Sequence, residues 1–258
     1  MIFETHAHYD DGRFDKDRDA LIQSLPEAGI GVVINSAASV ESNRDTVALA
    51  EQYAHVYAAV GVHPSGIAEM DEDVLNWMKE KTAWEKTVAI GEIGLDYYWE
   101  KEPEVQERQR YWFGRQMELA RETGLPIIVH SRDAAADTMQ VMKEHHAEEI
   151  PGVIHCYSYS KEMAMEFIKM GYYIGVGGVV TFDNAKKLKE VVEAIPLERI
   201  LLETDCPYLT PVPYRGKRNS SLYLPYVVEK IAEIRGISTD EVERVTEANA
   251  RALFTKVK

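Results

Sequence analysis

The chain has 258 residues, and its 29 Lys and Arg against 43 Asp and Glu give a formal net charge of −14. This acidity argues against sequence-independent binding of nucleic acid through overall charge, so a polyanionic substrate would require a basic loop or bound metals. The two cysteines are too few for a disulfide framework, and no apolar run is long enough to cross a membrane. Because residues 1–6 lack the basic and apolar regions of a secretory signal, we expect a cytoplasmic protein.

Short segments rich in valine and isoleucine alternate with longer segments of helical pattern along the chain. Parallel strands have this composition because both of their faces are buried. The sequence predicts eight such strands, at Ile2–Thr5, Val32–Asn35, Val56–Val60, Thr87–Ile90, Ile127–Val129, Val153–His155, Tyr172–Val176 and Ile200–Leu202.

Three of the intervening helices have recognisable boundaries. The longest is predicted at Glu104–Thr123, because Gly124 and Pro126 follow it and are typical of a helix end. An amphipathic helix is predicted to carry Pro225 in its first turn. The segment Ser238–Glu241 is typical of a capping box, so we expect a last helix to begin there.

The predicted strands begin roughly 28 residues apart, which is the length of a strand–helix unit. Eight such units without a break in composition predict an α/β fold, a (β/α)8 TIM barrel that spans residues 1–258 as a single domain. An open, doubly wound sheet is the alternative fold.

Side chains of the types that bind metal ions occur at the ends of six of the predicted strands, on the side of the barrel where active sites lie. A single histidine there is more often a hydrogen-bonded rim residue than a ligand, but six such groups on one rim can complete two metal sites. Nitrogen and oxygen ligands without thiolate are compatible with Mg²⁺, Mn²⁺, Fe²⁺ or Zn²⁺. The candidate ligands are His6, His8, Glu92, His130, His155 and Asp205.

Several segments around these residues resemble the TatD family of metal-dependent deoxyribonucleases, within the amidohydrolase-like barrels. The resemblance covers essentially the whole chain, and the segments occur in the family's order. They are Thr5–His8, Gly61–Pro64, Gly91–Tyr98, Pro126–Asp133, Ile154–Ser158, Leu202–Asp205 and Pro207–Pro211.

The resemblance implies a TIM-like barrel with two divalent metal ions, Mg²⁺, Mn²⁺ or Zn²⁺, per chain. His6, His8, Glu92 and Asp205 would bind one ion, and Glu92, His130 and His155 the other. It also implies hydrolysis of DNA phosphodiesters in the 3′→5′ direction by a metal-activated water, on single strands or frayed ends. We further expect no membrane partner and a monomer.

Three positions depart from the family pattern. Glu4 stands where the family usually has Asp, which puts the support of His6 in question. Ser65 replaces a histidine, and Ser220–Ser221 replaces a Glu-Pro pair. The last change lies in a loop beside the expected pocket, so it bears on substrate preference.

Asp205 and Glu92 are the expected catalytic residues. Asp205 would bind a metal and accept a proton from water as general base, although a carboxylate on a metal can be a ligand only. Glu92 would bridge both metals. His63 shares the rim and is a candidate contact for the phosphate or the leaving oxygen; the alternative is a rim hydrogen bond.

Three arginines are candidate phosphate ligands. Arg132 follows His130 by two residues and would point into the same end of the barrel if its strand continues. Arg215 and Arg218 lie in the loop Pro213–Asn219, which is basic within an acidic chain. Arginine forms a bidentate pair with phosphate, while a solvated surface is the alternative for all three.

Aromatic and small residues near the rim have two interpretations. Tyr97–Trp99, Tyr157 and Tyr159 can stack on splayed bases, but ordinary packing is the favoured interpretation for each. Gly175–Gly178 is expected to bend its strand and make space under the metals. Cys156 is expected to point away from the site and, like Cys206, to be a buried thiol.

Three functions remain open from the sequence. The first is a nuclease that shortens DNA from an end. The second is a hydrolase of another bond on the same metal frame, such as a D-aminoacyl-tRNA deacylase or an amidohydrolase. Many barrels that cleave C–N bonds use a modified lysine where this chain has Glu92, which favours the nuclease. The third is a metal-binding scaffold, which would not need all six ligands.

Overall fold

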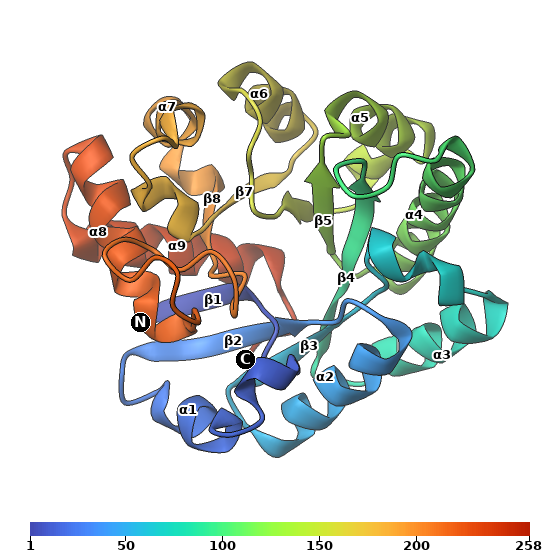
Figure 1. Ribbon diagram of the computed structural model, residues 1–258, viewed down its shortest axis with the longest axis horizontal. Coiled ribbons are helices and arrows are strands. Elements are labelled where there is room, and N and C mark those ends of the chain that lie inside the picture. The colour runs from blue at the N-terminus through green and yellow to red at the C-terminus, as the bar shows by residue number, and fades with distance from the viewer.

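The computed structural model describes all 258 residues. Its eight parallel strands form one sheet whose neighbours follow the chain order. In Figure 1 the helices surround these strands. The strands are β1 (Ile2–Ala7), β2 (Ile30–Ser36), β3 (Val56–Val60), β4 (Thr87–Asp96), β5 (Ile127–Arg132), β6 (Gly152–Ile154), β7 (Tyr173–Val176) and β8 (Ile200–Leu202).

The sheet closes on itself, because the chain beyond β8 pairs with the end of β1. Ala7 and Cys206 form a parallel bridge. The amide of Asp205 donates to the carbonyl of His6 at 3.0 Å, and the amide of His8 donates to the carbonyl of Cys206 at 2.9 Å. The TIM barrel is therefore confirmed, and the open sheet was the wrong alternative.

Nine α-helices accompany the strands, and most of them cover the outside of the barrel (Figure 1). They are α1 (Arg18–Ser24), α2 (Val40–Gln52), α3 (Glu72–Thr82), α4 (Pro103–Thr123), α5 (Ala135–Glu144), α6 (Lys161–Lys169), α7 (Lys186–Ala194), α8 (Leu224–Arg235) and α9 (Thr239–Leu253). None of them combines the length and the apolar character that crossing a bilayer requires.

The predicted helix boundaries are close to the observed ones. Helix α4 ends at Gly124, whose φ of 67° is the left-handed conformation that a glycine C-cap adopts. Pro225 lies in the first turn of α8. Ser238 caps α9 by accepting from the amide of Glu241 at 3.1 Å, but the return bond of a capping box is not formed.

Strand β4 is longer than predicted, and this moves ligand-type residues into the sheet. The prediction ended at Ile90, where the valine and isoleucine pattern stops. The backbone continues to pair with β5 after an irregularity, with Gly94 opposite His130 and Asp96 opposite Arg132. Backbone pairing does not depend on apolar side chains, so polar ligands are carried on rigid strands.

One end of the barrel is filled by apolar side chains. A cluster of 13 buried residues combines strand residues such as Ile34, Ala89 and Ile128 with Leu253 and Phe254 from the end of α9. The rings of Phe254 and of Phe3 in β1 are stacked, with centroids 6.0 Å apart. The candidate metal ligands lie toward the other end of the barrel, where the strands have their carboxyl ends.

Buried amide side chains fix the carboxyl ends of β3 and β4. Gln116 of α4 accepts from the amide of Val62 at 2.8 Å and donates to its carbonyl at 3.2 Å. Gln109, two helical turns earlier in α4, likewise accepts from the amide of Asp96 and donates to its carbonyl. Helix α4 thus holds two strand ends at the rim.

Replacing Gln116 by leucine keeps the volume but leaves the amide and carbonyl of Val62 without partners. We expect Gln116→Leu to lower the free energy of unfolding by about 2 kcal/mol, the cost of orphaned buried polar groups. Urea titration followed by circular dichroism measures this. Gln140→Leu on the exposed face of α5 is the control. Equal losses in both variants would contradict the assignment.

Candidate metal centre

Four ligand-type atoms from β1, β4 and the chain after β8 meet at the open end of the barrel. They are Nε2 of His6, Nε2 of His8, Oε2 of Glu92 and Oδ1 of Asp205. His6 lies 3.0 Å from His8, 3.3 Å from Glu92 and 3.8 Å from Asp205. His8 lies 3.5 Å from Glu92 and 3.3 Å from Asp205. We call these four residues the first set.

The other oxygen of Glu92 belongs to a second set of atoms. Its Oε1 lies 2.8 Å from Nδ1 of His130 and 2.8 Å from Nε2 of His155. His63 also approaches Oε1, with its Nε2 at 3.8 Å. Glu92 therefore presents one oxygen to each set, which is the arrangement of a carboxylate that bridges two cations.

The first set has the dimensions of a metal site. Four ligands about 2.1 Å from a cation lie about 3.4 Å apart in a tetrahedron and about 3 Å apart in an octahedron. The distances of 3.0 to 3.5 Å match these edges, and the 3.8 Å between His6 and Asp205 is slightly longer. The residues present thus fit a divalent cation without rearrangement, and the donor types suit Mg²⁺, Mn²⁺ or Zn²⁺.

The hydrogen bond of His8 to the backbone fixes its tautomer. Its Nδ1 lies 2.7 Å from the carbonyl of Ser36, which can only accept, so the proton resides on Nδ1. The lone pair on Nε2 then faces the first set. Such a bond to a histidine ligand orients the ring and increases its basicity.

The two carboxylates of the first set are ionised. Burial opposes ionisation of Glu92, but the facing imidazoles of His155, His63 and His6 hold its pKa well below the usual value. Burial also opposes ionisation of Asp205, and the neighbouring His8, His155 and His6 outweigh it, so this pKa is lowered as well. Two negative charges are therefore available to cations.

Sequence reasoning missed two buried carboxylates that contact the histidines of the second set. Oδ2 of Asp96 lies 3.1 Å from Nε2 of His130. Oε1 of Glu203 lies 3.5 Å from Nδ1 of His155. Asp96 follows Glu92 by four residues and Glu203 precedes Asp205 by two, so a search for further acidic residues near ligands would have found them.

Two of these atoms also lack partners, since Nδ1 of His155 and Oε2 of Glu203 form no hydrogen bond. Gly175 explains how this carboxylate fits, because a Cβ there would lie 2.3 Å from Oε2 of Glu203. The prediction that Gly175–Gly178 clear space for the metals is corrected at this position. The space at Gly175 accommodates Glu203.

Two of the departures from the family pattern contact each other. Oε1 of Glu4 accepts from the backbone amide of His6 at 3.2 Å, and Oε2 accepts from Ser221 at 2.9 Å. Thr204 also donates to Oε2, at 2.7 Å. Burial raises the pKa of Glu4 to about 8. The longer Glu4 side chain thus reaches Ser221 and links β1 to the segment before α8.

His63 is neutral and presents a proton to the centre. Burial and the neighbouring His130 lower its pKa to about 3. The amide of Ser65, the third departure, donates to its Nδ1 at 3.1 Å. An amide can only donate, so the imidazole proton is on Nε2, which faces Glu92. His63 is therefore both a rim hydrogen-bonding residue and a donor aimed into the site.

The three arginines differ in their availability. Arg218 forms a bidentate pair with Asp17 at 2.7 and 2.6 Å, so its guanidinium is already occupied. Arg132 and Arg215 are exposed and have no acidic partner. Arg215 stacks on Phe182 at 4.3 Å. Of the predicted phosphate contacts, Arg132 and Arg215 are free and Arg218 is paired.

Cys156 does not have the extended conformation on which the predicted direction of its thiol depended. That prediction assumed an extended strand, but β6 ends at Ile154 and Cys156 has a φ of 45°. Burial and the charges of Asp205 and Glu203 raise the pKa of its thiol well above the usual value. Cys156 is half-buried, Cys206 is buried, and both are free thiols.

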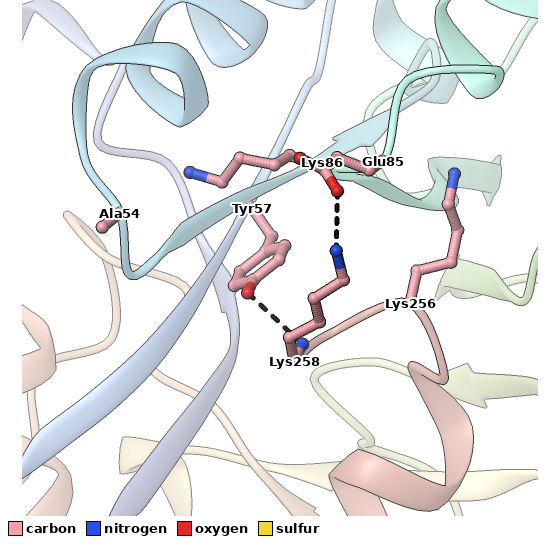
Figure 2. Close-up of a pocket in the computed structure, with 6 residues that line it drawn as sticks. All are labelled: Ala54, Tyr57, Glu85, Lys86, Lys256 and Lys258. Atoms are coloured by element: carbon pink, nitrogen blue, oxygen red, sulfur yellow. Dashed lines mark hydrogen bonds and ion pairs between the residues drawn. The ribbon is translucent and has the colours of Figure 1, made fainter.

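A cavity of about 210 Å³ lies at the opposite end of the barrel and is unrelated to this centre (Figure 2). Tyr57, Lys86 and Lys256 line it, but its lysines have partners within the protein. Lys86 donates to the carbonyl of Tyr53 at 2.6 Å, and Lys256 to that of Trp84 at 2.8 Å. These amines stabilise helix ends and are not directed at a ligand.

The barrel and its cluster of histidines and carboxylates define the chain as a metal-dependent hydrolase of the TIM-barrel class. The family model described as TatD related DNase matches residues 3–255, so the chain belongs to the TatD family.

Individual relatives agree with this assignment. The chain is 44% identical to the uncharacterized metal-dependent hydrolase YabD of Bacillus subtilis, over 98% of this chain and 99% of the relative. It is 34% identical to the uncharacterized metal-dependent hydrolase YcfH of Escherichia coli, over 98% and 96%. The crystal structure of YjjV, a TatD homologue from Escherichia coli, superposes with a TM-score of 0.90 at 33% identity, covering 98% of each chain.

The contact between Asp96 and His130 predicts a measurable contribution to metal binding. We expect Asp96→Asn to weaken divalent metal binding by about tenfold to a hundredfold, as loss of such a carboxylate partner does elsewhere. Calorimetric titration of metal-stripped protein with Zn²⁺ measures this. Asp137→Asn is the control, because Asp137 contacts Tyr97 and Arg110 and none of the six candidate ligands. Equal affinities of both variants would refute the role.

Proposed function

We propose that this protein is a deoxyribonuclease that holds two divalent ions and removes nucleotides from DNA in the 3′→5′ direction, acting on single strands or frayed ends. The observation that carries the proposal is Glu92, with one oxygen in each set of ligands. Two-metal sites of this kind recur in enzymes that cleave phosphodiesters. The name of the matching family supports DNA as the substrate.

The residues fit the ions, and their roles follow from the contacts. His6, His8, Glu92 and Asp205 would hold one ion, and Glu92, His130 and His155 the other. Bound there, the ions would neutralise phosphate charge and lower the pKa of water. Glu92 fixes the spacing between the two sets, while Asp96 and Glu203 orient the histidines of the second.

Asp205 is the residue best placed to accept a proton from the attacking water. Its lowered pKa keeps it ionised, and its side chain is partly exposed at 19%, whereas Glu92 is 5% exposed. The φ of 55° at Asp205 lies in the left-handed region, which non-glycine residues adopt uncommonly. We assign Asp205 both metal binding and proton acceptance.

His63 and Arg215 would act on the phosphate and the leaving group. The Nε2 proton of His63 faces the centre, so it can donate to a phosphate oxygen or to the departing oxygen. The guanidinium of Arg215 has no acidic partner and can approach the DNA backbone. These cationic and donor groups favour a phosphodiester over an amide substrate.

The activity is tested with metal-stripped protein and end-labelled single-stranded DNA, with Mg²⁺, Mn²⁺ and Zn²⁺ added in turn. We expect stepwise shortening that requires a metal, and a fall in turnover of at least about a hundredfold in Asp205→Asn, because a general base is lost. No shortening by metal-loaded wild type would reject the proposal. Deacylation of aminoacyl-tRNA and small amide substrates would then be assayed.

The two loop arginines should differ in their effect on DNA binding. We expect Arg215→Ala to raise KM severalfold and to reduce the slope of log affinity against log salt by about one, because one phosphate contact is lost. Arg218→Ala should change the salt slope less, since Arg218 is paired with Asp17. Measurements of KM over a series of salt concentrations distinguish the two. An unchanged slope in Arg215→Ala would exclude the contact.

A further inference from the structure

Three exposed side chains form a stacked group on the rim beside the second set. Trp99 is 69% exposed and Tyr98 is 44% exposed, and their rings meet edge to face with centroids 4.8 Å apart. The guanidinium of Arg132 lies 4.0 Å from the ring of Tyr98 and 5.7 Å from that of Trp99. We call Tyr98, Trp99 and Arg132 the rim platform.

The rim platform is attached to the candidate metal centre through one carboxylate. Oδ1 of Asp96 accepts from the amides of Tyr98 at 2.9 Å and Trp99 at 3.1 Å. Oδ2 of the same side chain lies 3.1 Å from Nε2 of His130. The position of the two aromatic residues is therefore fixed relative to a candidate metal ligand.

The position of Arg132 in β5 places it close to His130, the same candidate ligand. Arg132 follows His130 by two residues in β5, so both side chains lie on one side of the strand. In the register of β4 and β5, the backbone of Arg132 lies opposite that of Asp96. It has no acidic partner within the protein, although the chain carries 43 acidic residues. Its charge is thus available to an anion.

We propose that the rim platform stacks a nucleobase of single-stranded DNA next to the phosphodiester that is cleaved. This inference rests on the proposed function and names the part of the substrate that the rim recognises. Every base has a π-face, so an exposed indole or phenol ring can bind it without regard to sequence. Arg132 would approach the adjacent phosphate or stack on the base.

The size of the rim platform favours a base over a protein partner. Stable protein interfaces bury about 800 Å² on each partner, far more than two aromatic side chains supply. A single flat group of nucleobase size matches them better. Because the rim platform lies beside His130 and Asp96, a group bound on it would be next to the bond that is hydrolysed and so is best explained as part of the substrate.

The test compares two single-stranded oligonucleotides, one with ordinary nucleotides and one that lacks bases at its 3′ end. With Mn²⁺-loaded enzyme, we expect kcat/KM of wild type to favour the ordinary oligonucleotide by about tenfold, which is within the range for stacking of one base. Trp99→Ala should lose this preference, and Trp99→Phe, which retains an aromatic face, should keep it.

Tyr111→Ala is the matched control. Tyr111 is 52% exposed on α4, and the guanidinium of Arg115 lies 5.9 Å from its ring, so the same chemistry occurs away from the rim. This variant should retain the wild-type preference. A Trp99→Ala enzyme that still favours the ordinary oligonucleotide would overturn the inference, as would a wild type without a preference.

Failure of the proposed function can be distinguished from failure of this inference. If wild type cleaves neither oligonucleotide, the proposed function is contradicted, and the rim platform is judged by fluorescence anisotropy of the same two oligonucleotides with Mn²⁺-loaded protein. Tighter binding of the ordinary oligonucleotide by wild type, lost in Trp99→Ala, supports stacking. Equal binding of both by wild type overturns it.

Discussion

The candidate centre depends on the carboxylate of Glu92. Its two oxygens contact different groups, with His6 and His8 facing Oε2 and with His130 and His155 facing Oε1. A buried carboxylate of this kind would be costly without compensation, and the surrounding imidazoles keep it ionised. Glu92 lies at the irregularity between Ile90 and Ile93 of β4, where its amide donates to the carbonyl of Ala37 at 3.0 Å and so holds its backbone in place.

The rest of the rim supports this arrangement through hydrogen bonds. Ser36 and Asp96 each form a hydrogen bond with a histidine on the nitrogen that does not face Glu92, and Oε1 of Glu203 lies 3.5 Å from Nδ1 of His155. Helix α4 fixes the backbone at the ends of β3 and β4 through buried glutamines. Apolar side chains fill the interior at the other end of the barrel, so the candidate ligands are concentrated where the strands have their carboxyl ends.

The sequence predicted all eight strands because apolar β-branched segments mark buried parallel strands. It also predicted that the six candidate ligands would meet, since strand ends share one rim, but it missed Asp96 and Glu203. It did not show that β4 continues to Asp96, because backbone pairing there carries polar side chains. The pairing of Arg218 with Asp17 joins residues 201 positions apart, and the space for Glu203 depends on Gly175 in another strand. Such contacts follow from tertiary packing and not from local pattern.

Manganese spectroscopy can measure whether Glu92 would bridge two ions, one at each of its oxygens. Two ions bridged in this way lie about 3.5–4 Å apart, close enough for their electron spins to couple. Metal-stripped protein titrated with Mn²⁺ should bind two ions per chain and give the electron paramagnetic resonance spectrum of a coupled pair. A single bound ion, or two ions with independent spectra, would contradict the account.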